Sequence, residues 1–236
     1  MNALKILSGG AAQGLIAGLG PKFEAATGWT IAGDFGAVGG MATRLRSGEA
    51  VDAIVLTQAL IDALKDEGIV VANSIRPIGL VETALAVRSY DAVAPIADVG
   101  VLSQTLLMAD AIYVPDTKAS TAGAHVAKVL QQLGIADRVA SRLKIFANGA
   151  TAMRELAASG AKRPVGCTQA TEILATPGLQ LVGALPGEFA LSTIYTAGVT
   201  ARAADAAIAQ SFVDLLVARD QQALRARAGF LEPPRE

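Results

Sequence analysis

The chain has 236 residues, of which 52% are hydrophobic and 17% are charged, and its formal net charge is −1. This length allows one large domain or two smaller lobes, and the lack of clustered Lys and Arg argues against a nucleic-acid-binding surface. The single cysteine excludes an internal disulfide. One His and one Cys do not make a usual zinc ligand set, so we expect no metal and no cofactor. No uncharged apolar run reaches about 18 residues, so we expect no membrane span.

The N-terminal stretch LKILSGGAAQGLIAGLG predicts a strand at residues 4–7, a glycine turn and then a helix. A secretion signal is the first alternative, but glycines interrupt the apolar run that such a signal needs. A nucleotide-phosphate loop is the second alternative. Gly9 and Gly14 have the G-x-x-x-x-G spacing, but Leu15-Ile16 stand where Lys-Ser/Thr is required. What remains is a helix that begins directly after a strand and presents free N–H groups to an anion.

The same strand, turn and helix pattern recurs along the first third of the chain. Strands are predicted at residues 30–34 and 53–56, each followed by a helix, and Gly28 and Gly68 fit helix C-terminal stops. Alternating strands and helices predict an α/β fold with a mainly parallel sheet flanked by helices. In such sheets, ligands bind beyond the carboxyl ends of the strands.

The remaining elements continue this pattern. An extended segment at residues 80–87 and another at 192–199 are predicted to cross between two lobes. Ser120 or Thr121 is the predicted N-cap of a helix that ends near Gly134, and Asn148 or Thr151 caps a later one. Further predicted elements are a helix at 98–108, strands at 111–114, 144–146, 165–167 and 179–182, and a C-terminal helix carrying Ile208, Phe212, Leu215 and Leu216.

Four segments together resemble the molybdate-binding protein of bacterial ABC importers. They are LKILSGGAAQGLIAGLGPKFEAATG, FGAVGGMATRLRSGEAVDAIVL, STAGAHVAKVLQQLG and PVGCTQATEIL. The resemblance implies a two-lobed class II periplasmic-binding-protein fold that closes on its ligand like a hinge. The first lobe would comprise residues 1–84 and 197–236, and the second residues 85–196.

The resemblance also implies which residues form the ligand site. That family holds a tetrahedral oxyanion with hydroxyl and backbone N–H groups, but here Ala11, Val38 and Gln169 replace the hydroxyl-bearing residues. Each buried oxygen without a donor costs about 1–3 kcal/mol, so molybdate fits poorly and a carboxylate is the expected ligand. The expected ligand-binding residues are Ser8, Gly9, Gly10, Ala11, Gly36, Val38, Gly39, Thr57, Arg88, Ser120, Thr121, Ala122, Gly123, Asn148, Ala150, Thr168, Gln169 and Tyr195.

Three other residues carry chemistry that could serve a reaction. His125, the single histidine, lies in the first turn of the helix after Thr121 and is the candidate proton carrier, with a surface position as the alternative. Cys167 is expected to be a small buried apolar residue rather than a nucleophile. Glu172 is expected to be solvated or to cap a helix, although it lies close enough in sequence to Gln169 to reach the cleft.

Two functions remain open from the sequence. The first is binding of a small anionic ligand in an interlobe cleft. The second is a cytoplasmic isomerase of the aconitate isomerase type, which moves a proton on an unsaturated polycarboxylate. No obvious signal peptide precedes the first strand, so we expect a cytoplasmic protein. A periplasmic location, with an ABC permease as partner, applies if a leader has been removed.

Overall fold

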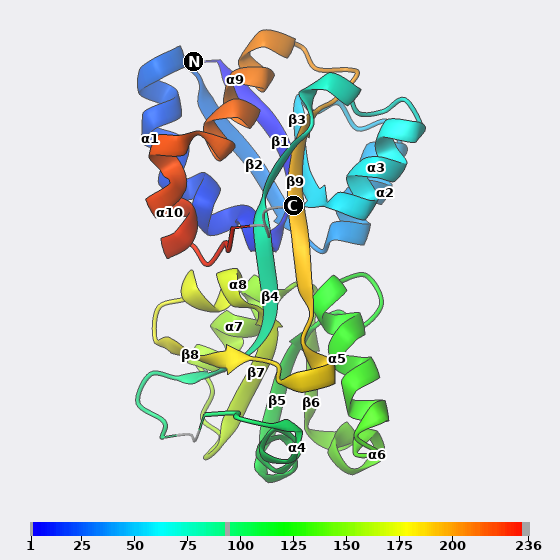
Figure 1. Ribbon diagram of the computed structural model, residues 1–236, viewed down its shortest axis with the longest axis vertical. Coiled ribbons are helices and arrows are strands. Elements are labelled where there is room, and N and C mark those ends of the chain that lie inside the picture. Colours follow the sequence, from blue (N-terminus) through cyan, green and yellow to red (C-terminus); the bar gives the residue numbers. More distant parts are fainter. Residues whose placement is uncertain (1, 93–94, 233–236) are drawn as a thin grey trace. The chain divides into compact units, whose positions relative to one another are not determined.

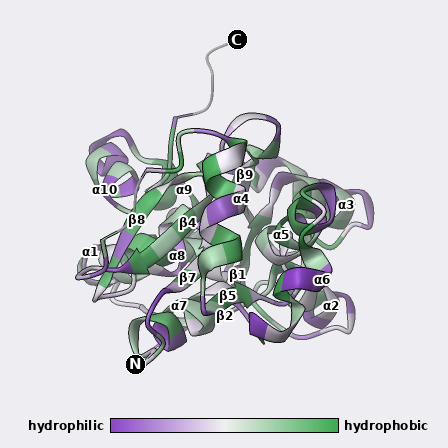
Figure 2. Cartoon of the chain, turned by 90° about the horizontal axis from the view of Figure 1, so that it is seen from below, coloured by the Kyte–Doolittle hydropathy of each residue, from purple (hydrophilic) through white to green (hydrophobic). Residues whose placement is uncertain are grey.

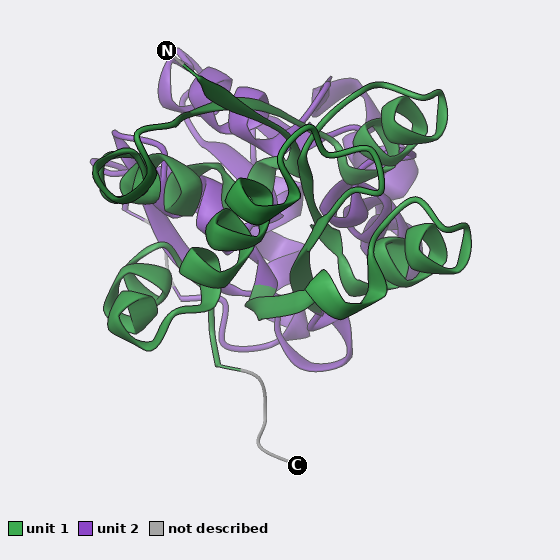
Figure 3. Ribbon diagram, turned by 90° about the horizontal axis from the view of Figure 1, so that it is seen from above, with its two compact units in different colours: residues 1–81, 193–236 green, residues 82–192 purple. Residues whose placement is uncertain are grey.

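The computed structural model describes residues 2–92 and 95–232 (Figure 1). The chain divides into two compact units, shown in different colours in Figure 3. Unit 1 comprises Met1–Val81 and Thr193–Glu236, and unit 2 comprises Glu82–Ser192. Both boundaries lie a few residues before the ones expected from the sequence. The chain passes from unit 1 to unit 2 within one long strand, β4 (Arg76–Arg88), and returns at the start of β9 (Ser192–Val199).

Unit 1 is a sheet with strand order β2-β1-β3-β9. β1 (Ala3–Gly9) pairs in parallel with β2 (Thr30–Gly36) and β3 (Ala53–Thr57), whereas β9 runs antiparallel to β3. In Figure 1, α1 (Gln13–Thr27), α9 (Ala206–Val217) and α10 (Gln222–Arg227) lie together on one side of these strands. α2 (Val38–Arg46) and α3 (Gln58–Asp66) lie together on the other. The short 3₁₀ turns of this unit are Gly10–Ala12, Ala72–Ser74 and Arg219–Gln221.

Unit 2 has the strand order β4-β7-β5-β6, and β8 pairs with the other edge of β4. β5 (Ala111–Pro115) is parallel to β6 (Leu143–Phe146) and β7 (Pro164–Gln169), while β4 is antiparallel to β7 and to β8 (Leu179–Ala184). Its helices are α4 (Val99–Met108), α5 (Thr121–Gln132), α6 (Ala136–Val139), α7 (Gly149–Ala157) and α8 (Ala170–Leu174). Two 3₁₀ turns, Ala140–Arg142 and Gly187–Phe189, complete the unit.

Each unit has its own hydrophobic core. Unit 1 buries one large cluster in which Phe23 of α1 meets Phe212 of α9 edge to face, with 5.9 Å between ring centroids. Unit 2 buries one cluster under α4 and α5 and a smaller one under α7 and α8, so both faces of its sheet are covered. Figure 2 shows hydrophobic colours along the strands and hydrophilic patches on outer helices such as α6 and α10. None of the helices among the described residues is long and apolar enough to cross a membrane.

The sequence signals for helix ends are confirmed. Gly28, Gly68 and Gly134 follow α1, α3 and α5 with φ between 65° and 73°, the left-handed conformation that glycine adopts without a steric penalty. Ser120 and Asn148 are the N-caps of α5 and α7. These glycines and N-caps therefore mark where the helices end or begin.

Candidate functional site

In unit 1, the turns after β1 and β2 meet beside Tyr195. The Gly9 backbone lies so close to α2 that a Cβ placed on it would stand 2.7 Å from Cγ1 of Val38 and 3.0 Å from Cε1 of Tyr195. Tyr195 is buried, and its ring packs edge to face on Phe230 at 6.4 Å. Three segments that are distant in sequence thus form one edge of unit 1, at the carboxyl ends of its parallel strands.

α2 begins with free donors at this edge. Its N-cap Ala37 has no side-chain oxygen, and the first backbone donation into the helix comes from Met41 to the carbonyl of Ala37. Within the described part of the chain, no hydrogen bond takes up the N–H groups of Val38, Gly39 and Gly40. Such first-turn N–H groups, together with the helix dipole, favour an anion. This edge is therefore suited to bind negative charge without a basic side chain.

The other residues expected at this edge lie in the turns or at the strand ends. The Ser8 hydroxyl donates to the carbonyl oxygen of Gly9 at 2.9 Å, so it supports the turn. Thr57 ends β3 opposite Tyr195 and is the N-cap of α3, without a side-chain cap bond. Gly10 and Ala11 lie in the buried 3₁₀ turn that precedes α1. Gly36 ends β2 under Met41, whose Cε would stand 2.6 Å from a Cβ there.

In unit 2, the N-terminus of α5 lies at the end of β5. Ser120 caps the helix by accepting from the N–H of Gly123 at 3.4 Å, and the N–H groups of Thr121 and Ala122 have no partner among the described residues. A Cβ on Gly123 would stand 2.2 Å from the carbonyl oxygen of Asp116, so only glycine lets α5 start this close to the preceding loop. This helix end presents the same kind of donors as α2 does.

The start of α7 is occupied from within the protein by Glu172. The hydroxyl of Thr168 donates to Oε2 of Glu172 at 2.5 Å, and a Cβ on Gly149 would stand 1.9 Å from the same oxygen. Burial raises the pKa of Glu172 to about 7, while the Thr168 hydroxyl and the backbone N–H groups of Gln169 and Ala150 act in the opposite direction. Asn148 accepts from the N–H of Thr151 at 2.8 Å and caps α7. Glu172 was expected to be solvated or to cap a helix, and its burial shows that the solvated alternative is wrong.

Gln169 lies at the carboxyl end of β7, directly opposite Thr83 of β4. Both side chains are buried, and neither the Gln169 amide nor the Thr83 hydroxyl has a hydrogen-bond partner among the described residues. Buried polar groups in folded proteins nearly always have a partner, so these groups need hydrogen bonds that the described residues do not supply. Thr83 was not among the residues expected from the sequence.

Arg88 requires a correction. Because β4 runs antiparallel to β7, Arg88 lies toward the amino end of β7 and not at the carboxyl edge where the anion was expected. Its guanidinium donates to both oxygens of Asp91, at 2.7 and 3.0 Å, and to the carbonyl oxygen of Ser159. The Asp91 carboxylate raises the pKa of Arg88. Arg88 is therefore a structural residue of unit 2.

His125 lies on α5, half-buried, and its Nε2 makes a 2.8 Å hydrogen bond with the carbonyl oxygen of Phe189. Since a carbonyl only accepts, Nε2 is the donor and links α5 to the turn after β8. Cys167 is buried as expected, and burial raises the pKa of its thiol to about 12, which keeps it protonated and unreactive. No group of three or more His, Cys, Asp or Glu among the described residues is arranged to hold a metal ion.

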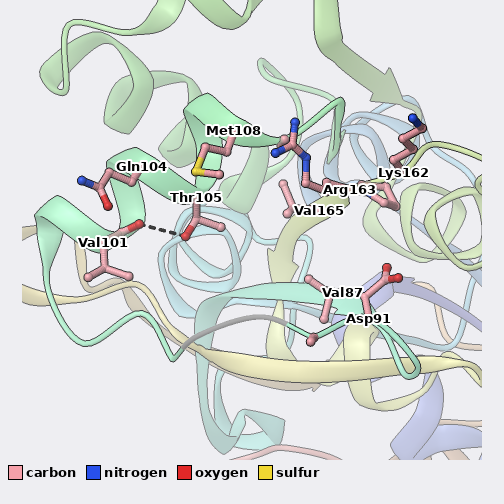
Figure 4. Close-up of a pocket in the computed structure, with 12 residues that line it drawn as sticks. Val87, Asp91, Val101, Gln104, Thr105, Met108, Lys162, Arg163 and Val165 are labelled. Carbon is pink, nitrogen blue, oxygen red and sulfur yellow. Dashed lines mark hydrogen bonds between the residues drawn. The ribbon is translucent and has the colours of Figure 1, made fainter.

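A cavity of about 430 Å³ lies elsewhere in unit 2, lined by α4, the end of β4 and the start of β7 (Figure 4). Val87 and Val165 contribute apolar walls, and Lys162 and Arg163 also line the cavity. Arg163 is paired with Asp110 at 3.3 Å. This cavity lies at the amino end of β7, so it is separate from the helix N-termini described above.

Two α/β units linked by two strand crossings, each with helix N-termini at the ends of its parallel strands, define a solute-binding protein. The chain belongs to the bacterial extracellular solute-binding protein family, whose model matches residues 4–231. The fold resembles that of the periplasmic molybdate-binding protein of Azotobacter vinelandii, with a TM-score of 0.81 and 18% identity over 98% of this chain and 100% of that one.

Two further relatives extend the comparison. The sulfate-binding protein of Mycobacterium tuberculosis is similar with a TM-score of 0.72 and 18% identity, covering 98% of this chain and 86% of that one. In sequence, the chain is 24% identical over 228 residues to an aconitate isomerase of Pseudomonas sp., which covers 93% of this chain and 84% of the relative. The molybdate-binding-like periplasmic-binding-protein fold expected from the sequence is confirmed.

Proposed function

We propose that the protein binds a small anion, a carboxylate in preference to molybdate, and that both units contribute backbone N–H groups to it by hinge closure. The observation that carries the proposal is the uncapped start of α2. There, Val38, Gly39 and Gly40 present N–H groups that no described residue takes up. α5 repeats this feature in unit 2 at Thr121 and Ala122. Family membership supports the same function, since solute-binding proteins capture small ligands.

The preference for a carboxylate follows from the side chains at the two edges. Ala11 and Val38 are apolar, and Gln169 offers an amide. A tetrahedral oxyanion has four oxygens that each need donors, whereas one carboxylate group needs donors at two. Each helix N-terminus matches one such group. A di- or tricarboxylate would use both edges.

A pair of variants at each edge tests the role of the backbone donors. Val38→Pro removes one N–H at the first position of α2, where proline is tolerated because Ala37 is already extended, with ψ at 133°. Val38→Ala shortens the same side chain but keeps the N–H. Thr121→Pro and Thr121→Ala form the equivalent pair at α5, after Ser120 with ψ at 135°.

We expect each proline variant to bind anions at least about tenfold more weakly than its alanine control in titration calorimetry, since one charge-assisted hydrogen bond is lost. A prior thermal-shift screen of sulfate, molybdate, and di- and tricarboxylates identifies the ligand, because a ligand at 100 times its Kd stabilises the folded state by about 2.7 kcal/mol. If no anion shifts the melting temperature, the proposal is wrong.

A second candidate function is isomerisation of an unsaturated polycarboxylate, and the match to aconitate isomerase over 93% of the chain favours it. His125 is the residue proposed to carry the proton. With Nε2 donating to Phe189, Nδ1 is the nitrogen left to exchange it. Incubation with cis- and trans-aconitate in deuterated water, followed by NMR, tests this candidate. Interconversion with deuterium uptake that is lost in His125→Gln supports it, and the absence of both excludes it.

A further inference from the structure

Four buried side-chain polar atoms have no hydrogen-bond partner among the described residues; one is Oγ1 of Thr171 in α8, and the other three lie at the carboxyl end of β7. These three are Oγ1 of Thr83 and both Nε2 and Oε1 of Gln169. Thr83 is 0% exposed and Gln169 is 3% exposed. The two residues are directly paired across the antiparallel strands β4 and β7, so their side chains lie on the same face of the sheet. An amide and a hydroxyl are therefore neighbours, and both need hydrogen bonds.

The alternation of side chains along β7 identifies this face. Val165 and Cys167, which alternate with Gly166 and Thr168, belong to the core cluster that includes Val126 of α5. Thr168 lies on the opposite face and meets Glu172. By the two-residue period of a strand, Gln169 lies on the α5 face. The free N–H groups of Thr121 and Ala122 begin α5 on that face, at the end of the neighbouring strand β5.

The chemistry of the three atoms limits what can satisfy them. Nε2 of Gln169 and the Thr83 hydroxyl can donate to an anion, but Oε1 of Gln169 can only accept. A fully ionised sulfate, molybdate or simple carboxylate has acceptors alone. Placed here, it would leave Oε1 without a partner or turn a lone pair toward it, which is unfavourable in a buried site.

We propose that the ligand is a hydroxy acid: a di- or tricarboxylate with a hydroxyl group that donates to Oε1 of Gln169 and accepts from the Thr83 hydroxyl. This inference rests on the proposed anion-binding function and specifies its ligand class. The carboxylate occupies the N-terminus of α5, and the adjacent hydroxyl group satisfies the Thr83 and Gln169 pair. Gln169 and Thr83 then determine specificity, while the helix N–H groups supply the attraction for charge.

Two matched ligand pairs test the proposal by titration calorimetry on the full chain. Malate and succinate differ by one hydroxyl group, as do citrate and tricarballylate. We expect the hydroxylated member of at least one pair to bind at least about tenfold more tightly, because a site built around a hydroxyl discriminates against the analogue that lacks it. This measurement needs no variant, so it does not depend on how a substitution affects folding.

Variants then test which residues cause the preference for the hydroxylated ligand. Gln169→Met and Thr83→Val keep the side-chain shape and remove the polar atoms, and either should reduce the preference to less than about threefold. Gln104→Met is the matched control. It makes the same substitution in unit 2, but at the cavity near the amino end of β7. Its preference should equal that of the unchanged protein.

Each outcome decides the matter. If both members of each pair bind equally, this inference is overturned and the proposed function stands. If only sulfate and molybdate bind, the inference and the proposed preference for a carboxylate both fail, and only small-anion binding remains. If Gln104→Met abolishes the preference as strongly as Gln169→Met, the assignment to the Thr83 and Gln169 pair is overturned. If no anion of the panel binds at all, the proposed function itself fails, and the inference falls with it.

Discussion

The carboxylate of Glu172 lies against the Cα of Gly149. A Cβ on that glycine would stand 1.9 Å from Oε2 of Glu172 and 2.3 Å from Oγ1 of Thr168. The contact joins the first residue of α7 to α8, 23 residues later in the chain. An internal carboxylate thus takes the position at the start of α7 that a bound anion would otherwise favour, so α5 is the helix of unit 2 proposed to bind the anion.

Gly149→Ala should destabilise the protein strongly. The added methyl group overlaps two buried polar side chains, and overpacking of this kind typically costs about 1–3 kcal/mol. Urea unfolding measures the loss. Gly160→Ala is the control, since nothing lies within 4 Å of a Cβ at Gly160. Equal stability of the two variants would show that the Glu172 carboxylate does not lie against Gly149 in solution.

The stability of the protein should fall as pH rises toward neutrality because of Glu172. Its carboxyl has an ordinary pKa of 4.5 in the unfolded chain and about 7 in the folded protein, so the folded state holds the proton more tightly. The contribution is fully present below pH 4.5 and is lost as pH rises through about 7. At about 1.4 kcal/mol per pKa unit, the total change is on the order of 3 kcal/mol.

Glu172→Gln tests this pH dependence, because the amide resembles the protonated carboxyl and cannot ionise. The variant should match the unchanged protein near pH 4.5 and exceed it in unfolding free energy above pH 7. All other titrating groups are shared, so they cancel in the difference between the two proteins. Parallel pH profiles of the two unfolding free energies would contradict the raised pKa.

Most of the element order could be predicted from the sequence, because it rests on local signals. Glycine stops such as Gly28 and Gly134 and caps such as Ser120 act within one helical turn, and they lie where expected. Strand direction is different, because it depends on pairing with distant segments. β4 was expected to be an extended crossing. Its own residues do not predict its antiparallel pairing with β7, and for this reason Arg88 was expected at the wrong edge of the sheet.

The candidate site was predictable to the same extent. The glycine turns and helix starts at Gly9, Val38 and Thr121 come from local patterns, and each lies at the end of a parallel strand. The importance of Thr83 and Glu172 comes from burial and from neighbours far away in the sequence. A single threonine in an apolar strand carries no pattern that distinguishes it from an ordinary strand residue.

Gly9→Ala should weaken anion binding more than it weakens folding. Its methyl group would stand 2.7 Å from Val38 and 3.0 Å from Tyr195, so the start of α2 and its free N–H groups must shift. We expect at least about a tenfold loss of affinity in titration calorimetry, since helix N–H groups bind only when aligned. Gly160→Ala, which has nothing within 4 Å of the added Cβ outside its chain neighbours, is the control and should not change affinity. Unchanged affinity in Gly9→Ala would remove this edge from the proposed site.

Arg88→Ala should lower the free energy of unfolding and leave the affinity for the ligand unchanged. The side chain of Arg88 is 7% exposed and is paired with Asp91, so its removal leaves a largely buried carboxylate without its cation. Breaking such a pair typically costs about 3–5 kcal/mol. Arg163→Ala breaks the Arg163–Asp110 pair, whose members are 60% and 39% exposed, and should cost less than about 1 kcal/mol. Urea unfolding and calorimetric titration of the folded fraction separate the two effects. A loss of affinity at unchanged stability would return Arg88 to the ligand site and contradict the position that the antiparallel pairing of β4 gives it.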